Sequence, residues 1–169
     1  GRRVADDMPV LHGVTLERTT MAPGDSCAAH LEWRALAKLP AGSYDVAVRF
    51  DRDLPADFHP PRWCAKPLRK LLEKRRHERY RFRIDHLPVD GEYGVDLWRP
   101  DQVVHDVVPI VVPMDAAPGE WTVQVRMLRQ PHYPNFQVSD YFLDHDYYSG
   151  VPVARLRITR PQTAPRGTR

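Results

Sequence analysis

The stretch VVPMDAAPGEWTVQV, residues 111–125, predicts a tight turn that leads directly into a strand. Pro118 fixes the backbone angle φ near about −65°, and Gly119 can take the positive φ that such turns require. Beyond the turn every second side chain is apolar, beginning with Trp121. A period of two is typical of a strand that buries one face, so the turn aims a large aromatic residue into a core.

A shorter copy of this turn occurs at residues 21–25, MAPGD, and precedes a second alternating segment that ends in Trp33. In both copies an acidic residue, Asp25 or Glu120, follows the glycine, and we expect its carboxylate to face water. The residues around the two turns do not otherwise match, so they are not an internal repeat. They indicate two strands that bring a tryptophan into the same core.

Alternation of apolar and polar residues recurs along the chain and predicts further strands. The expected strands lie at residues 14–16, 27–33, 44–50, 80–84, 103–112, 121–127 and 154–158. The strand at 103–112 has the most continuous apolar run, which favours deeper burial than in the others. Pro109 within it favours an edge position or a bulge, because proline has no N–H to give to a neighbouring strand.

The 17 prolines of the chain favour short elements joined by turns over long helices. About seven or eight strands separated by Pro, Gly and Asp turns predict an all-β fold, an immunoglobulin-like antiparallel β-sandwich. We expect a single domain over residues 1–160 and a disordered tail at 161–169. No apolar run approaches the roughly 18 residues of a membrane span.

Residues 62–79 are the exception, a predicted helical insertion whose surface helix covers about residues 66–79, with Leu68, Leu71 and Leu72 on one helix face. Residues 66–79 carry seven Lys or Arg and two Glu, a local net charge of +5 in a chain of net charge +3. The candidates for contact with an anionic surface, such as lipid headgroups, are Arg69, Lys70, Lys74, Arg75 and Arg76. The alternative is a solvated helix face. The lack of interleaved aromatic residues argues against nucleic acid as a partner.

The long loop expected at residues 130–150 concentrates tyrosines and aspartates. Tyrosine offers an apolar face and a hydrogen-bonding hydroxyl, which suits stacking on a sugar. The candidate ligand-binding residues are Tyr133, Tyr141, Tyr147, Asp144 and Asp146. The alternative is that these rings pin the loop to the sandwich. A calcium site at Asp140, Asp144 and Asp146 lacks the ligand order of an EF-hand, so turn capping is the favoured interpretation and no metal is predicted.

Two cysteines, Cys27 and Cys64, are too few for a disulfide framework. One bridge between them stays open as an alternative, although Cys27 lies in phase with Ala29 and Leu31 and is more simply a small core residue. No G-x-S-x-G or H-E-x-x-H motif occurs. The sequence therefore predicts no catalytic residue and no cofactor.

Three segments together are similar to a known group of domains. They are LWRPDQVVHD at residues 97–106, VPMDAAPGEWTV at residues 112–123, and the strand from Pro23-Gly24-Asp25 to Trp33-Arg34-Ala35. In this order they resemble the β-sandwich domains appended to bacterial membrane glycosyltransferases and related envelope proteins. The chain departs from that pattern at Asp101, where the family has Gly, at Trp121, where it has Tyr, and in its helix.

The resemblance implies an extracytoplasmic domain, in the periplasm or on the cell surface, within a larger membrane-anchored protein. It implies a non-catalytic accessory or binding module, with a glycan or another envelope protein as its partner. One alternative is a structural spacer or protein-interaction domain that docks through the basic helix or a strand edge. Within a membrane-tethered parent protein, we also expect contact of the basic helix with the membrane surface. A metal-dependent hydrolase is less favoured, because it needs His and Asp side chains that converge in one pocket.

Overall fold

The structure, a computed structural model, describes residues 8–53, 57–58, 60–61, 64–129 and 151–160. Within them a three-stranded sheet has the order β1-β3-β6 and a five-stranded sheet has the order β2-β8-β7-β4-β5. The strands are β1 (Val10–Leu16), β2 (Thr20–Met21), β3 (Ser26–Arg34), β4 (Tyr44–Arg52), β5 (Arg81–His86), β6 (Val103–Val111), β7 (Gly119–Arg129) and β8 (Val151–Ile158). Neighbouring strands are antiparallel, except for the short parallel pair of β2 and β8.

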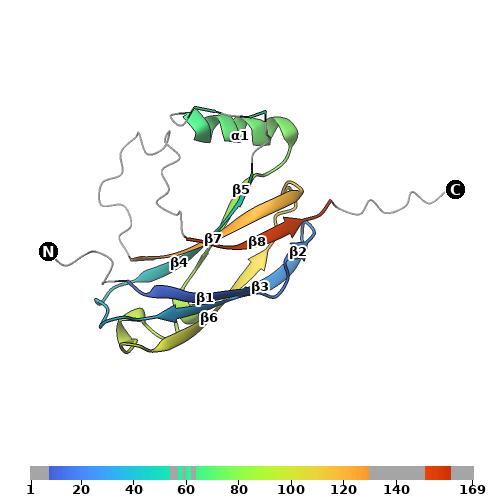
Figure 1. Ribbon diagram of the computed structural model, residues 1–169. Coiled ribbons are helices and arrows are strands. Elements are labelled where there is room, and N and C mark those ends of the chain that lie inside the picture. Colours follow the sequence, from blue (N-terminus) through green and yellow to red (C-terminus); the bar gives the residue numbers. More distant parts are fainter. Residues whose placement is uncertain (1–7, 54–56, 59, 62–63, 130–150, 161–169) are drawn as a thin grey trace.

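Figure 1 shows the two sheets as stacked layers, with α1 (Ala65–Arg76) outside them on the side away from the three-stranded sheet. Strands β1, β3, β4, β5, β6, β7 and β8 take the A, B, C, C′, E, F and G positions of an immunoglobulin-like sandwich. Residues 87–102 hold no D strand, and form the 3-10 turns η3 (Pro88–Gly91) and η4 (Val95–Leu97) instead. The predicted immunoglobulin-like β-sandwich with one inserted helix is confirmed.

The core between the sheets is built around the tryptophan that the turn at 111–125 was expected to bury. Trp121 on β7 is fully buried, and its ring contacts Phe82, which stacks on Phe50 with 4.3 Å between the ring centroids. The Trp121 indole N–H donates to the carbonyl of Ala117 at 2.9 Å. In immunoglobulin domains a tyrosine makes a similar backward bond near the start of strand F, so tryptophan takes its place here.

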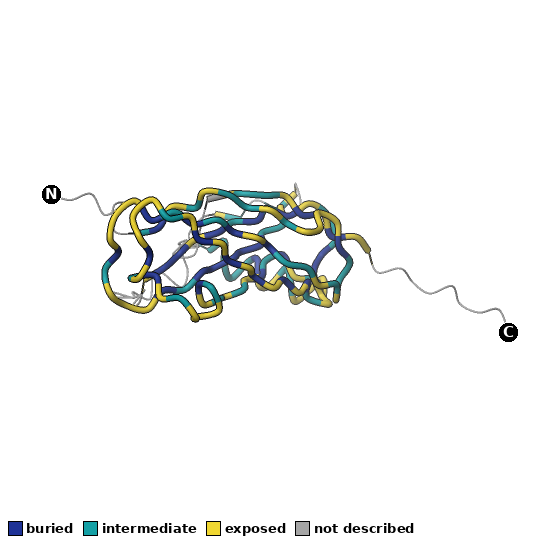
Figure 2. Tube along the Cα trace, turned by 90° about the horizontal axis from the view of Figure 1, so that it is seen from below, coloured by how far each residue is buried: buried dark blue, intermediate teal, exposed yellow. Residues whose placement is uncertain are grey.

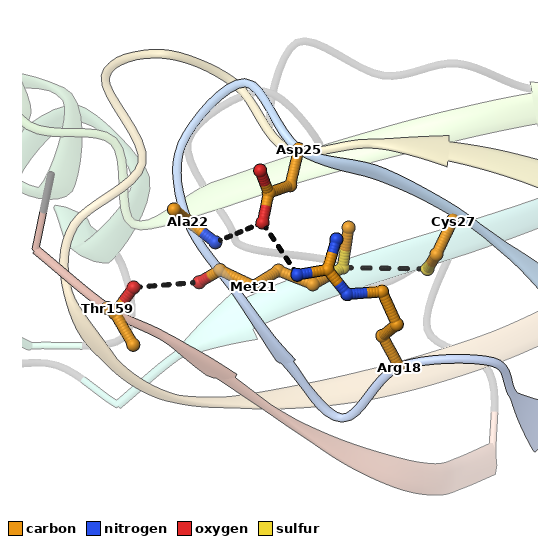
Figure 3. Close-up of polar contacts among 6 residues, drawn as sticks. All are labelled: Arg18, Met21, Ala22, Asp25, Cys27 and Thr159. Atoms are coloured by element: carbon orange, nitrogen blue, oxygen red, sulfur yellow. Dashed lines mark hydrogen bonds and ion pairs between the residues drawn. The ribbon is translucent and has the colours of Figure 1, made fainter.

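The first Pro-Gly turn is bonded to Val112, which follows β6 and begins the connection that leads to the second Pro-Gly turn. The Gly24 N–H donates to the carbonyl of Val112 at 2.8 Å, and the Val112 N–H donates to the carbonyl of Asp25 at 2.9 Å. Figure 3 shows the Asp25 carboxylate closing its own turn: it accepts the Ala22 N–H at 2.9 Å and the Arg18 guanidinium at 3.0 Å. The Asp25 side chain is 34% exposed, so it faces water in part and also closes the turn. The hydrogen bond from the Ala22 amide lowers the pKa of Asp25.

The turn between β6 and β7 also anchors the chain that returns from α1. The helix ends at Arg76 and is capped by His77, whose φ of 53° is left-handed. Beyond it the Arg79 N–H donates to the carbonyl of Asp115 at 2.6 Å, and the Ala117 N–H donates to the carbonyl of Arg79 at 2.9 Å. The Arg79 guanidinium pairs with the Asp115 carboxylate as well, at 2.9 Å. The inserted helix is thus tied to the same turn that positions Trp121.

Strand β6 lies at the end of the three-stranded sheet, which confirms the edge position predicted from Pro109. The deeper burial expected for this strand is wrong, because exposed and buried residues alternate along its whole length. Figure 2 shows such changes between buried and exposed residues along the strands. Strand β2 was not predicted, since two residues show no periodicity. No helix in the described part of the chain is long and apolar enough to cross a membrane.

The turn before β7 requires glycine at position 119, because of the backbone angle there and because of the atoms around it. Substitution of Gly119 therefore tests this turn. Its φ is +132°, and a Cβ there would lie 2.9 Å from Nε of Arg52, which donates to the carbonyl of Pro118 at 2.6 Å. We expect Gly119→Ala to lower the free energy of unfolding in urea by about 1–3 kcal/mol. The control is Gly13→Ala, whose Cβ meets only the flexible Glu32 side chain, and it should change stability by less than about 1 kcal/mol. Equal effects of the two substitutions would contradict this account.

Candidate functional site

The most exposed set of apolar side chains on any one strand lies on the outer side of β6 in the described residues. Val103, Val107 and Val111 are 42%, 47% and 58% exposed, whereas Val104, Asp106, Val108 and Ile110 between them are buried. We name the outward side chains the β6 face: Val103, His105, Val107, Pro109 and Val111. The β6 face carries no Lys, Arg, Asp or Glu. Charged side chains and proline are usual protections of an edge strand, and of these the β6 face has only Pro109.

The backbone of β6 presents hydrogen-bonding groups at the sheet edge. Val112 bonds through both its N–H and its C=O to Gly24 and Asp25, on the side of β3. Since backbone groups of successive residues in a strand point to opposite sides, the N–H and C=O of the odd-numbered residues 103–111 point away from β3. No backbone bond joins them to another described segment. Pro109 stands at one of these outward positions, where its missing N–H leaves the pairing with β3 intact.

The residues directly beside one end of the β6 face are uncharged. On β3, Ser26 lies beside Val111 and Ala28 lies beside Pro109. Met114, just beyond the strand, is 76% exposed. Two ion pairs lie nearby: Arg18 meets Asp25 at 3.0 Å in the turn beside Val112, and His30 meets Glu17 at 3.2 Å farther along the sheet. The bond from the Ala28 N–H lowers the pKa of the Glu17 carboxyl. The side chains directly beside Val111 and Pro109 are therefore uncharged, and the Arg18–Asp25 ion pair lies in the adjoining turn.

A buried polar pair joins the two sheets behind the β6 face. Asp106 on β6 is fully buried, and its Oδ1 lies 2.9 Å from Nε2 of His86, at the end of β5. The same oxygen accepts the N–H of Val89 at 3.0 Å, while Oδ2 has no hydrogen-bond partner among the described residues. Val89 and Asp90 both have a φ of +53°, which is strained for a β-branched valine. The strained backbone at Val89 thus orients its N–H so that it donates to the buried Asp106 carboxylate.

The chemistry of the His86 pair is limited by what surrounds it. A histidine oriented by a buried carboxylate is the arrangement of a general base or a metal ligand. The nearest further group is Asp90, 3.8 Å from His86 Nδ1 and itself exposed. The described residues contain no group of three or more His, Cys, Asp or Glu that could hold a metal. The bond between His86 and Asp106 joins β5 to β6.

Removing one member of a buried pair leaves the other without its main partner, and this gives a test. We expect His86→Ala to lower the free energy of unfolding by about 3–5 kcal/mol in urea. The double variant with Asp106→Ala should recover part of that loss, with a coupling above about 1 kcal/mol. The control is His105→Ala, because His105 is exposed and meets Glu32 only at 3.6 Å. Similar losses for His86→Ala and His105→Ala would show that the pair does not join the sheets.

The structure divides the basic residues of the helix. Lys70, Lys74, Arg75 and Arg76 are exposed. Arg69 is 8% exposed, so it does not belong to an exposed anion-contacting surface as the sequence suggested. Arg76 donates to the hydroxyl of Tyr80 at 3.3 Å, and this bond raises the pKa of the guanidinium. Contact of the remaining cations with an anionic surface stays a prediction.

The C-terminal end of α1 carries side chains of both charges rather than cations alone. A cavity of about 510 Å³ opens at its C-terminal end. It is lined by Glu73, Lys74, His77, Glu78, Arg79, Arg81 and Asp115. The predicted leucine stripe is split as well, because Leu72 packs against the core while Leu71 is 61% exposed. The carboxylates among the lining residues make this end of the helix a poor match for a simple anion.

The sugar-binding and calcium hypotheses fall on residues outside the described part of the chain. These are Tyr133, Tyr141, Tyr147, Asp144 and Asp146, together with Asp140. Cys27 and Cys64 form no disulfide with each other, because both are free thiols. Cys27 Sγ lies 3.5 Å from Sδ of Met21 (Figure 3), and burial raises the pKa of the thiol. Cys27 is therefore a residue packed against the core, as its phase in the strand indicated.

Sequence reasoning missed the β6 face and the polar pair behind it. The available signal was Asp106, a charged residue within an otherwise apolar strand, which marks a position that needs a partner. Pro109 marked the edge, but an apolar run alone does not tell which side of a strand is covered. The partner of Asp106, His86, lies on another sheet, so no local pattern connects them.

Comparisons with known proteins show neither a family nor a function for this chain. No family model and no curated protein matches the chain. Among solved structures the chain is similar to the CARDB domain of a protein from Pyrococcus furiosus, determined in complex with di-metal ions. The two share 7% sequence identity over 92% of this chain and 97% of that one, with a TM-score of 0.39. The β-sandwich that the resemblance implied is present, whereas the association with membrane glycosyltransferases stays a prediction.

Proposed function

We propose that this domain is a non-catalytic accessory module of an extracytoplasmic envelope protein, and that it docks to a protein surface through the β6 face. The observation that carries the proposal is the row of exposed valines on an edge strand whose outer backbone groups no other described segment pairs. Uncovered apolar edges of this kind are rare in proteins that have no partner for them.

The sandwich is suited to present such a surface with little rearrangement. Val104, Val108 and Ile110 are buried in the core, so the outward side chains between them have fixed positions. Backbone groups at an edge supply directional bonds, while alternate side chains supply apolar contact, which is how added strands are recognised. A binding role therefore needs no group beyond those that the strand already carries.

Site-specific photo-crosslinking in the parent protein tests the docking proposal. A benzophenone amino acid at Val107 or at Val111 should yield a discrete adduct in cells, identified by mass spectrometry. The control is the same amino acid at Thr15, which is exposed on the other edge strand of the same sheet. Adducts at Thr15 as strong as those at Val107, or none at either valine, would overturn the proposal.

A second candidate function, carbohydrate binding, rests on the tyrosines and aspartates of residues 130–150. Tyrosine rings stack on sugars, and carboxylates accept bonds from sugar hydroxyls. A glycan array on the full chain should then show binding that Tyr141→Ala and Tyr147→Ala both abolish. Tyr93→Ala is the control, because Tyr93 bonds locally to the carbonyl of Leu97 at 3.0 Å. A blank array on folded protein would rule this candidate out.

A further inference from the structure

We propose that the occupant of the β6 face is a second copy of this chain. Two β6 strands would pair antiparallel about a two-fold axis at Val107, so that two three-stranded sheets continue into one six-stranded sheet. This inference rests on the proposed docking function and names the partner. A two-fold interface requires a patch that is complementary to itself.

The spacing of the valines selects one register. With Val107 opposite Val107 of the second copy, Val103 lies opposite Val111 at both ends, and His105 lies opposite Pro109. A register shift of two residues in either direction places Val107 opposite His105 or Pro109, so that the valines of the two copies no longer face one another. One register therefore aligns all of the valines, and apolar β-branched pairs across strands stabilise a sheet.

The backbone of the outer edge is compatible with this pairing. The odd-numbered residues would exchange N–H and C=O bonds with their counterparts, as directly opposed residues do in an antiparallel ladder. Pro109 donates nothing, so the opposing His105 carbonyl receives no backbone bond there. In the pair, a bridging water would have to supply the donor that Pro109 lacks at this carbonyl. The proline thus removes one backbone bond on each side of the two-fold axis, which weakens the pairing but leaves the bonds at Val103, Val107 and Val111 in place.

The charges of the surface also permit self-association. No Lys, Arg, Asp or Glu lies on the β6 face, so the pairing brings no like charges opposite each other. The nearby charges are already matched within one copy, with Arg34 and Asp101 2.7 Å apart. Helix α1 lies on the far side of the sandwich from the three-stranded sheet (Figure 1), away from the proposed contact.

Sedimentation velocity on the full chain provides the first test. The unmodified protein should form a dimer that dissociates on dilution. Val107→Lys places two ammonium groups opposite each other and should weaken self-association by at least about tenfold. Thr15→Lys adds the same charge to the other edge strand and should leave the dimer unchanged. A monomer at concentrations up to about 1 mM, or a dimer that is unaffected by Val107→Lys, would overturn the inference.

Disulfide trapping tests the register in a background of Cys27→Ala and Cys64→Ser. Directly opposed residues that exchange hydrogen bonds have Cα atoms about 5.5 Å apart, which a disulfide can bridge. Val107→Cys should therefore cross-link to itself under mild oxidation. Val103→Cys and Val111→Cys should cross-link when mixed, and neither should do so alone. A dimer in which Val107→Cys stays reduced would contradict the proposed pairing.

The photo-crosslinking at Val107 separates this inference from the docking proposal. An adduct with the mass of a second copy supports both. An adduct with a different protein, together with a monomer in sedimentation, overturns the self-pairing and leaves the docking function standing. No adduct at Val107 or Val111 overturns both.

Discussion

The bond from the Trp121 indole to the carbonyl of Ala117 holds the turn on which the rest of the structure depends. The ring fills the core, and the bond fixes the turn that precedes it. The connection between β6 and β7 is also hydrogen-bonded to two other segments. Val112 bonds to the Gly24 turn, and Asp115 bonds to Arg79 in the chain that returns from α1. Segments far apart in the sequence therefore meet at residues 112–121, and the sheets and the helix take their relative positions there.

The turn also determines which side of β6 is exposed. Because Val112 bonds toward the Gly24 turn, the even-numbered residues of β6 face β3 with their backbone and the core with their side chains. Side chains alternate with a period of two, so a shift of one residue would bury the exposed valines and expose Asp106. The buried bond between His86 and Asp106 opposes that shift. The surface proposed for docking thus follows from the same constraints that stabilise the fold.

Much of the fold could be predicted from the sequence, because turn residues and alternation are local signals. The Trp121 and Trp33 strands, the edge position suggested by Pro109 and the inserted helix were all predicted in this way. Burial of Arg69, closure of a turn by Asp25 and the exposed side of β6 depend on contacts between distant segments. The pattern of apolar and polar residues in a strand is the same whether or not another strand pairs with its edge. Periodicity could therefore not reveal that no D strand covers β6.

Amide hydrogen exchange along β6, followed by NMR at low and high protein concentration, tests the central claim most directly. The account predicts slow exchange at Val104, Asp106, Val108 and Ile110 at every concentration, because these amides bond to β3. The amides of Val103, His105, Val107 and Val111 should exchange fast in dilute protein and slowly in concentrated protein. Slow exchange of these odd-numbered amides in dilute protein would contradict the account, since the outer edge would then already be covered within one copy.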